Sequence, residues 1–423
     1  MLEVSNLKTY FSILRGTVYA VDGVTFHLDR GETMGLVGES GCGKTTMAFA
    51  ITRLLPPNGR IVGGEIVFDG TLIGRADFPT ELSEVLKEPL WLEETKDLVE
   101  RKMERLVSPE EGDESSSVME SRMLLEQERA CVEEVNAVLS DENLSAEEIR
   151  AELEDLVDDE LNSFLAKRRR KRIEREIEEK MADIRWSKIS MIFQGAMNAF
   201  NPVYKVGDQI MEALLQHEEM TKDEAKERVM DLFDLVGLER SRVTGYPHEF
   251  SGGMRQRAII AMSLACNPQL IIADEPTTAL DVIMQDRILA EIRDLQRELR
   301  IAMMIITHDI SVVAEVAETI GIMYAGKLFE FGDIVSIFEQ SANPYTIGLK
   351  GAFPSIKGKR KRLSSIPGSP PDLSEPPLGC RFHPRCKFAQ EICRREEPSN
   401  FQVAENHWSL CHFAKEIYSG QLT

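Results

Sequence analysis

The chain has 423 residues, of which 43% are hydrophobic, so it is long enough for two or three packed domains. Its net charge of −21 argues against nucleic acid as the main partner. The opening "MLEVSNLKTYF" lacks a signal-peptide pattern and no run of 18 apolar residues follows, so we expect a cytosolic chain without a membrane span.

Residues 38–46, "GESGCGKTT", match the P-loop pattern G-x4-GK[ST]. An apolar stretch, "ETMGLVG", precedes them and a helical pattern, "KTTMAFAITRLL", follows, which is the strand–turn–helix context that the motif requires. We expect backbone N–H groups to cradle nucleotide phosphates, Lys44 to contact the β- and γ-phosphates and the Thr45 hydroxyl to ligate Mg²⁺. The predicted cradle comprises Gly38, Glu39, Ser40, Gly41, Cys42, Gly43, Lys44, Thr45 and Thr46, and the Cys42 side chain receives no role.

The segment 76–185, here called the insert, carries most of the net negative charge, because its 33 acidic and 17 basic residues give −16 of the total of −21. Its apolar residues recur at helical spacing, and "SAEE" from Ser145 is a capping-box start. We expect two or three long helices, such as a coiled-coil hairpin. The basic run 167–172 is interpreted as a solvated helix face that balances nearby acids, with a contact to anionic lipid or RNA as the alternative.

After the insert, "ISMIFQ" marks the return of a globular pattern, and "TKDE" at 221–224 opens a further helix. Two apolar strands are predicted at "QLIIADEP" and "IAMMIITHD". From about residue 340 the composition shifts to Pro, Gly and Lys, which indicates a linker before a Cys-rich tail.

Four cysteines gather in that tail, in the pattern Cys380-x5-Cys386-x6-Cys393-x17-Cys411. In a cytosolic chain such a group favours metal ligation over disulfides, and four thiolates can hold either Zn²⁺ or a [4Fe–4S] cluster. Four reduced thiols without a metal are the remaining alternative.

"SGGMRQR" at 251–257, followed by "LIIADEPTTALD", together with the P-loop resembles the ATP-binding cassette (ABC) family. The resemblance implies an α/β P-loop NTPase fold of the RecA-like kind, an ABC nucleotide-binding domain with a helical subdomain. We expect this domain to span residues 1–330, interrupted by the insert, with the helical subdomain at about 205–265 and a Cys-rich C-terminal extension at 331–423.

The resemblance also assigns site residues for ATP and Mg²⁺. Asp274 would hold Mg²⁺ with Thr45 and Gln194, Glu275 would polarise the attacking water, and His308 would contact the γ-phosphate. The signature residues, which in this family reach the nucleotide held by a partner subunit, are Ser251, Gly252, Gly253 and Gln256. Asp281 resembles the residue of the loop that links the two sites.

Tyr10 resembles the aromatic residue that stacks on adenine. Phe11 and Tyr19 are competing candidates, and a core role for Tyr10 is the alternative.

Several stretches, among them "YPHEFSGGMRQRAIIAMSLACNPQLIIADEPTTALDV", look like the ATPase subunit of dipeptide/oligopeptide importers, and the tail "GCRFHPRCKFAQEIC" strengthens this likeness. The resemblance favours the iron–sulfur cluster over zinc. It implies ATP-driven peptide import through two separate permease subunits, a second ATPase (a heterodimer preferred, a homodimer possible) and, indirectly, an extracytoplasmic solute-binding protein. The chain would be cytoplasmic and peripheral on the inner face of the membrane.

Two alternatives remain open at this point. Nickel or oligosaccharides could replace peptides as the solute, and the chain could instead be a soluble ABC ATPase acting on chromosomes or ribosomes. In the chromosome-type proteins the coiled coil follows the glutamine that Gln194 resembles, whereas the insert precedes it.

Overall fold

The computed structural model describes residues 1–76, 78–87, 91–107, 129–141, 144–162, 164–195, 199–277, 282–352 and 366–422. Two sheets organise these residues. The smaller sheet is antiparallel, in the order β2-β1-β4-β5, and is made of β1 (Leu2–Ile13), β2 (Gly16–Leu28), β4 (Gly59–Phe68) and β5 (Thr71–Arg75).

The larger sheet has the order β11-β12-β10-β9-β3-β8-β7-β6. Its parallel part comprises β6 (Ile189–Ile192), β7 (Leu270–Asp274), β8 (Ala302–Thr307), β3 (Thr33–Val37) and β9 (Thr319–Tyr324). Its antiparallel part adds β10 (Lys327–Asp333), β12 (His407–Leu410) and β11 (Asn400–Ala404). Strands β3, β7 and β8 are buried along their whole length, as expected for a parallel sheet covered on both faces.

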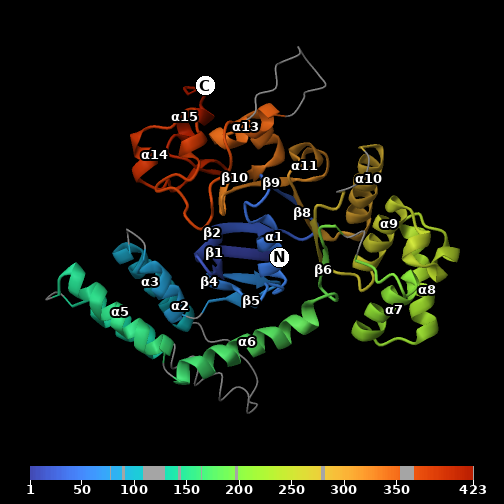
Figure 1. The fold of residues 1–423 in the computed structure, drawn as a ribbon, viewed down its shortest axis with the longest axis horizontal. Coiled ribbons are helices and arrows are strands. Elements are labelled where there is room, and N and C mark those ends of the chain that lie inside the picture. Colours follow the sequence, from blue (N-terminus) through green and yellow to red (C-terminus); the bar gives the residue numbers. More distant parts are fainter. Residues whose placement is uncertain are drawn as a thin grey trace.

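Around this sheet lie α1 (Lys44–Ile51), α10 (Val282–Leu299), α11 (Ile310–Val316), α12 (Ile334–Glu339) and α13 (Pro344–Ala352). A helical region contains α7 (Val206–His217), α8 (Lys222–Leu235) and α9 (Gly252–Ser263), with 3-10 turns at Arg240–Thr244 and Pro247–Glu249. In Figure 1 this region lies on the opposite side of the strands from α2, α3 and α5, while α6 crosses beneath the strands between the two groups.

The insert forms α2 (Phe78–Val85), α3 (Trp91–Val107), a helix at residues 129–139, α5 (Ala146–Asn162) and α6 (Phe164–Ile184). Leu82, Leu98, Val132 and Leu153 are fully buried in a hydrophobic cluster that α2, α3, the helix at 129–139 and α5 share. In the described residues of the insert, these helices therefore form a cluster with its own core.

Helix α6 contacts both α5 of the insert and β5 of the smaller sheet. Its last turns contribute Ile177, Met181 and Ile184 to the core under the sheets. Directly after it, Arg185 donates to the carbonyl oxygens of Thr52 and Arg53 at the end of α1. The insert is thereby fixed to the helix that follows the P-loop.

The C-terminal extension does not stand apart from the preceding residues. Glu330 and Phe331 of β10 pair with Ser409 and Trp408 of β12, so the chain end extends the main sheet. The rest of the extension forms a 3-10 turn at His383–Arg385, α14 (Glu391–Arg395) and α15 (Ala414–Tyr418), which lie above β9 and β10 in Figure 1.

Candidate ATP site

The phosphate cradle begins where β3 ends and closes where α1 begins. Gly41 and Gly43 have positive φ values of 78° and 102°. A Cβ on Gly43 would lie 2.0 Å from the Ala20 carbonyl oxygen, and one on Gly38 would lie 2.1 Å from the Met323 carbonyl oxygen. These positions require glycine because the backbone of β2 and β9 closes tightly around the loop.

Lys44 is buried inside this loop. Its ammonium donates to the carbonyl oxygens of Gly38 and Glu39, at 2.8 and 2.9 Å. The P-loop is therefore preorganised around a cation, which suits a polyphosphate ligand.

Asp274 ends β7, and its carboxylate is 1% exposed. Burial raises the pKa of Asp274, while a hydrogen bond from the Thr45 hydroxyl and the charge of Lys44 oppose that rise. Its Oδ2 is buried and has no hydrogen-bond partner among the described residues. A buried carboxylate oxygen without a partner, next to a threonine hydroxyl, is a donor set that fits Mg²⁺.

Three predicted catalytic side chains converge beyond the carboxyl ends of neighbouring strands. Gln194 follows β6, Glu275 follows β7 and His308 follows β8. The Glu275 carboxylate accepts a hydrogen bond from Gln194 Nε2 at 3.0 Å and lies 2.9 Å from His308 Nδ1. Glu275 also has a left-handed backbone, with φ of 48°, an uncommon conformation for a non-glycine residue that concentrates at functional sites.

The signature residues begin helix α9. Ser251 is exposed and caps the helix, because its hydroxyl accepts a hydrogen bond from the Met254 N–H at 3.3 Å. Gly252 and Gly253 form the first turn, and Gln256 is buried. Helix α9 packs on α7, α8 and β6, whereas the P-loop lies between β3 and α1 (Figure 1). Asp281 lies outside the described residues.

The assignment of Tyr10 to adenine does not fit the structure. Tyr10 is 5% exposed, donates its hydroxyl to Asp22 at 2.8 Å and packs edge-on against Tyr19. It is a core residue, because its ring faces are covered. Tyr19 is half-buried, and its neighbour Ala20 touches the P-loop at Gly43, so the competing aromatic lies beside the cradle.

The four tail cysteines lie together. Cys380, Cys386, Cys393 and Cys411 line one cavity, whose walls include Phe382 and Phe413. All four are free thiols, and burial raises the pKa of Cys380 and of Cys411 to about 12. Among the described residues, no group of three or more His, Cys, Asp or Glu side chains is arranged to hold a metal ion.

Sequence reasoning missed a contact between the tail and the P-loop. Arg385 donates from both terminal nitrogens to the Glu39 carboxylate, at 2.5 and 2.9 Å. The Glu39 N–H donates to the Tyr345 hydroxyl at 3.1 Å. The motif pattern treats Glu39 as a free position, so the pattern gives no signal for these partners.

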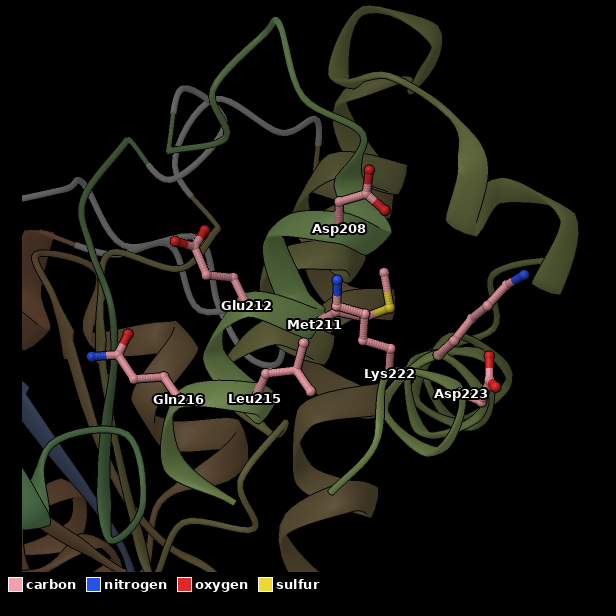
Figure 2. A pocket seen from close by; sticks show the side chains of 8 residues that line it. Asp208, Met211, Glu212, Leu215, Gln216, Lys222 and Asp223 are labelled. Carbon is pink, nitrogen blue, oxygen red and sulfur yellow. The ribbon is translucent and has the colours of Figure 1, made fainter. Parts of the chain in front are cut away.

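A second hollow lies on the helical region, between α7 and α8 (Figure 2). Asp208, Glu212 and Asp223 line it together with Lys222 and Lys226. Its acidic side chains disfavour a polyphosphate, so we do not assign it to the nucleotide.

The sequence comparisons agree with this geometry. The ABC transporter family model matches residues 21–278, and the model of the oligopeptide/dipeptide transporter C-terminal region matches residues 329–393. The oligopeptide transport ATP-binding protein OppD of Bacillus subtilis (strain 168) is 36% identical over 412 residues, which cover 96% of this chain and 87% of the relative. The dipeptide transport ATP-binding protein DppD of the same organism is 35% identical over 413 residues, with 97% and 94% covered.

A P-loop on a parallel sheet and the ABC transporter match together define an ATP-binding cassette ATPase, which couples ATP hydrolysis to transport. Within that class, the chain belongs to the ATP-binding proteins of the oligopeptide/dipeptide importer family. None of the helices in the described residues has the length and apolar character needed to cross a membrane.

Proposed function

We propose that the chain powers the import of dipeptides or oligopeptides through a separate membrane permease, from the inner face of the cell membrane. The observation that carries this proposal is the convergence of Gln194, Glu275 and His308 beside the P-loop, in a chain whose extension matches the peptide-transporter C-terminal region. Two permease subunits and a second ATPase, preferably a different chain, complete the transporter, and an extracytoplasmic binding protein delivers the solute.

In this proposal the P-loop N–H groups and Lys44 bind the phosphates of ATP, and Tyr19 stacks on the adenine. Thr45 and Asp274, with Gln194 as the third predicted ligand, would hold Mg²⁺, which would neutralise negative charge on the phosphates. Glu275 accepts a proton from the attacking water. His308 orients the Glu275 carboxylate, as their 2.9 Å contact supports.

Ser251, Gly252 and Gly253 complete the site of the partner ATPase, because a helix N-terminus that presents free N–H groups favours a γ-phosphate. Closure of two ATPase subunits on two nucleotides, and their reopening after hydrolysis, would drive the permease between its two states. For Asp281 we propose, from the family resemblance alone, a role in the loop that links the two sites.

Purification through a tag from gently solubilised native membranes, followed by mass spectrometry, tests this function. We expect two multi-span permease subunits and a second ATPase to accompany the chain. Recovery without permease, together with ribosomal or chromosomal proteins, would contradict the importer function and favour the alternative ABC activity.

For the tail, we propose that Cys380, Cys386, Cys393 and Cys411 hold a [4Fe–4S] cluster. Burial raises the pKa of Cys380 and Cys411 and so disfavours free thiolates in this cavity, and bound iron would compensate their charge. Zinc needs its sulfurs about 2.3 Å from a single ion, whereas in a cluster each thiolate binds a different iron. The cavity that the four cysteines share supports a common metal centre, and the resemblance of the tail to the peptide-importer extension favours the cluster over zinc.

Anaerobic purification should give a brown protein with broad absorbance near about 400 nm and stoichiometric iron and sulfide. Cys386→Ser should lose this absorbance. Cys131→Ser, which changes a buried cysteine of the insert, should keep it. If the wild-type protein is colourless and contains zinc, the assignment of a cluster is wrong and the four cysteines form a zinc site.

A further inference from the structure

The strongest connection that the ATP site makes outside the known motifs runs from the P-loop to the tail. Arg385 lies in the 3-10 turn directly before Cys386, and its side chain is 5% exposed. Both terminal nitrogens donate to the Glu39 carboxylate, in the two-point geometry that makes Arg–carboxylate pairs specific. The second position of the cradle is therefore tied to a residue 346 positions further along the chain.

Arg385 is itself held firmly in this place. Its Nε donates to the Pro367 carbonyl oxygen at 2.8 Å, and its guanidinium lies over the ring of Tyr324. The same tail segment is anchored a second time, because Arg381 forms a buried ion pair with Asp22 of β2. The guanidinium is thus fixed by the folded tail before any ligand binds, and it presents a rigid cation to the loop.

Glu39 makes this cation necessary. It places a carboxylate, 27% exposed, in a loop that receives the anionic phosphates of ATP. Lys44 does not neutralise it, because the Lys44 ammonium donates to the backbone carbonyl of Glu39 and to that of Gly38. A carboxylate without a paired cation would repel the phosphates and leave the loop free to move.

We propose that Arg385 is a positioning residue of the ATP site, which neutralises Glu39 and fixes the P-loop in its ATP-binding conformation. The inference rests on the proposed function only in taking the P-loop as the ATP site. If Arg385 has this role, the C-terminal extension contributes to nucleotide binding in addition to extending the main sheet.

The electrostatic role predicts a rescue. Arg385→Ala should raise the Kd for ATP by about tenfold or more, because it leaves the carboxylate uncompensated beside the phosphates. Arg385→Ala combined with Glu39→Gln should recover most of the lost affinity, since the repelling charge is then absent. Arg385→Lys should give a smaller loss, because an ammonium cannot bridge both oxygens in the same way.

Kd is measured by titration of a fluorescent ATP analogue into the purified full-length chain, and KM and kcat are measured in the assembled transporter. We expect KM to rise while kcat stays near the wild-type value, since Arg385 contacts Glu39 of the cradle, whereas the Glu275 carboxylate is held by Gln194 and His308. Arg395→Ala, which removes an exposed ion pair to Glu391 in the same extension, is the matched control and should bind ATP normally.

If wild-type protein binds ATP and Arg385→Ala binds it equally well, Arg385 does not position the loop. If affinity falls but Glu39→Gln restores none of it, the role is only that of a structural contact and the inference is wrong. If Arg385→Ala does not fold, the ATP affinity of Arg385→Lys is compared with that of Arg385→Lys combined with Glu39→Gln. Recovery of affinity in the double variant supports the electrostatic role, and no recovery contradicts it. A wild-type chain that binds no ATP would overturn the proposed function itself, and this inference with it.

Discussion

Glu275 holds a backbone conformation that few side chains tolerate, and its neighbours explain why it can. The Glu275 N–H donates to the Ile306 carbonyl oxygen at 2.8 Å, and its carboxylate is held by Gln194 and His308. Three strands must end at the same level for this to happen, so the geometry depends on the parallel register of β6, β7 and β8. A carboxylate that is aimed in this way is prepared to accept a proton.

Glu275→Gln keeps the size and shape of the side chain but removes the carboxylate that would accept the proton from water. We expect hydrolysis to fall by a factor of about 10² to 10⁴, while ATP binding persists. Phosphate release over many turnovers and nucleotide titration measure the two properties separately. Retained multi-turnover hydrolysis would remove Glu275 from its proposed role.

Adenine binding gives a second residue-level prediction. Tyr19→Ala should weaken ATP binding by about 1–3 kcal/mol, the usual value of stacking a base on an aromatic ring. Tyr10→Phe is the control, because it deletes the buried hydroxyl that bonds to Asp22 and leaves the ring in the core. Equal affinity for Tyr19→Ala and wild type, measured by the same nucleotide titration, would contradict the assignment.

At the level of single residues, local motifs made the site predictable. The P-loop and Asp274 are recognisable because strand, turn and carboxylate are contiguous in the sequence. The partners of Glu39 were not predictable, because Arg385 and Tyr345 reach it only after the tail folds back. Tyr10 and Tyr19 lie on neighbouring strands, and only their burial distinguishes them.

Among the helices, the capping signals are confirmed. Ser145 and Glu148 exchange the hydrogen bonds of a capping box at α5, and Thr221 and Glu224 do so at α8. Helical periodicity predicted the insert helices but not their packing. Periodicity specifies which face is apolar, and the partner of that face depends on the turns between helices.

The insert contributes side chains to two separate cores, with Leu153 in the core of the insert helices and Met181 in the core under the sheets. Substitutions in the two cores should therefore have different effects on ATP binding. Leu153→Ala and Met181→Ala should each cost about 2–5 kcal/mol, because both side chains are fully buried. Leu153→Ala should raise hydrogen exchange in the insert helices and leave ATP affinity unchanged. Met181→Ala should destabilise the core beneath the P-loop helix and weaken ATP binding. Identical exchange patterns for the two variants would show that the two cores unfold as one.

On the scale of the whole molecule, the parallel sheet follows from alternating strands and helices, and the family resemblance anticipated the rest of the nucleotide-binding domain. The pairing of β12 with β10 was beyond sequence reasoning, because β11 and β12 have only 5 and 4 residues and give a weak strand signal. The chain end therefore completes the main sheet in a way that the composition of the tail, rich in Cys and Pro, did not indicate.

Two ATPase subunits acting together give a prediction at this scale. Ser251→Glu places a carboxylate where the proposed partner's γ-phosphate would lie, so hydrolysis by the assembled transporter should fall at least tenfold. ATP affinity of the isolated chain should stay at the wild-type value, because Ser251 caps α9, a different element from the P-loop and α1 that hold the chain's own nucleotide. Loss of ATP binding by the isolated chain would place Ser251 in its own subunit's site.

Because Glu39 and Arg385 are far apart in the sequence, the ribosome synthesises the P-loop well before the residue that neutralises its carboxylate. The P-loop is synthesised early, but its partner arrives 346 residues later, roughly 20–70 s at ordinary elongation rates. Until then the nascent cradle lacks the cation that neutralises it. A chain released before residue 385 should therefore bind ATP weakly, even though its P-loop is complete.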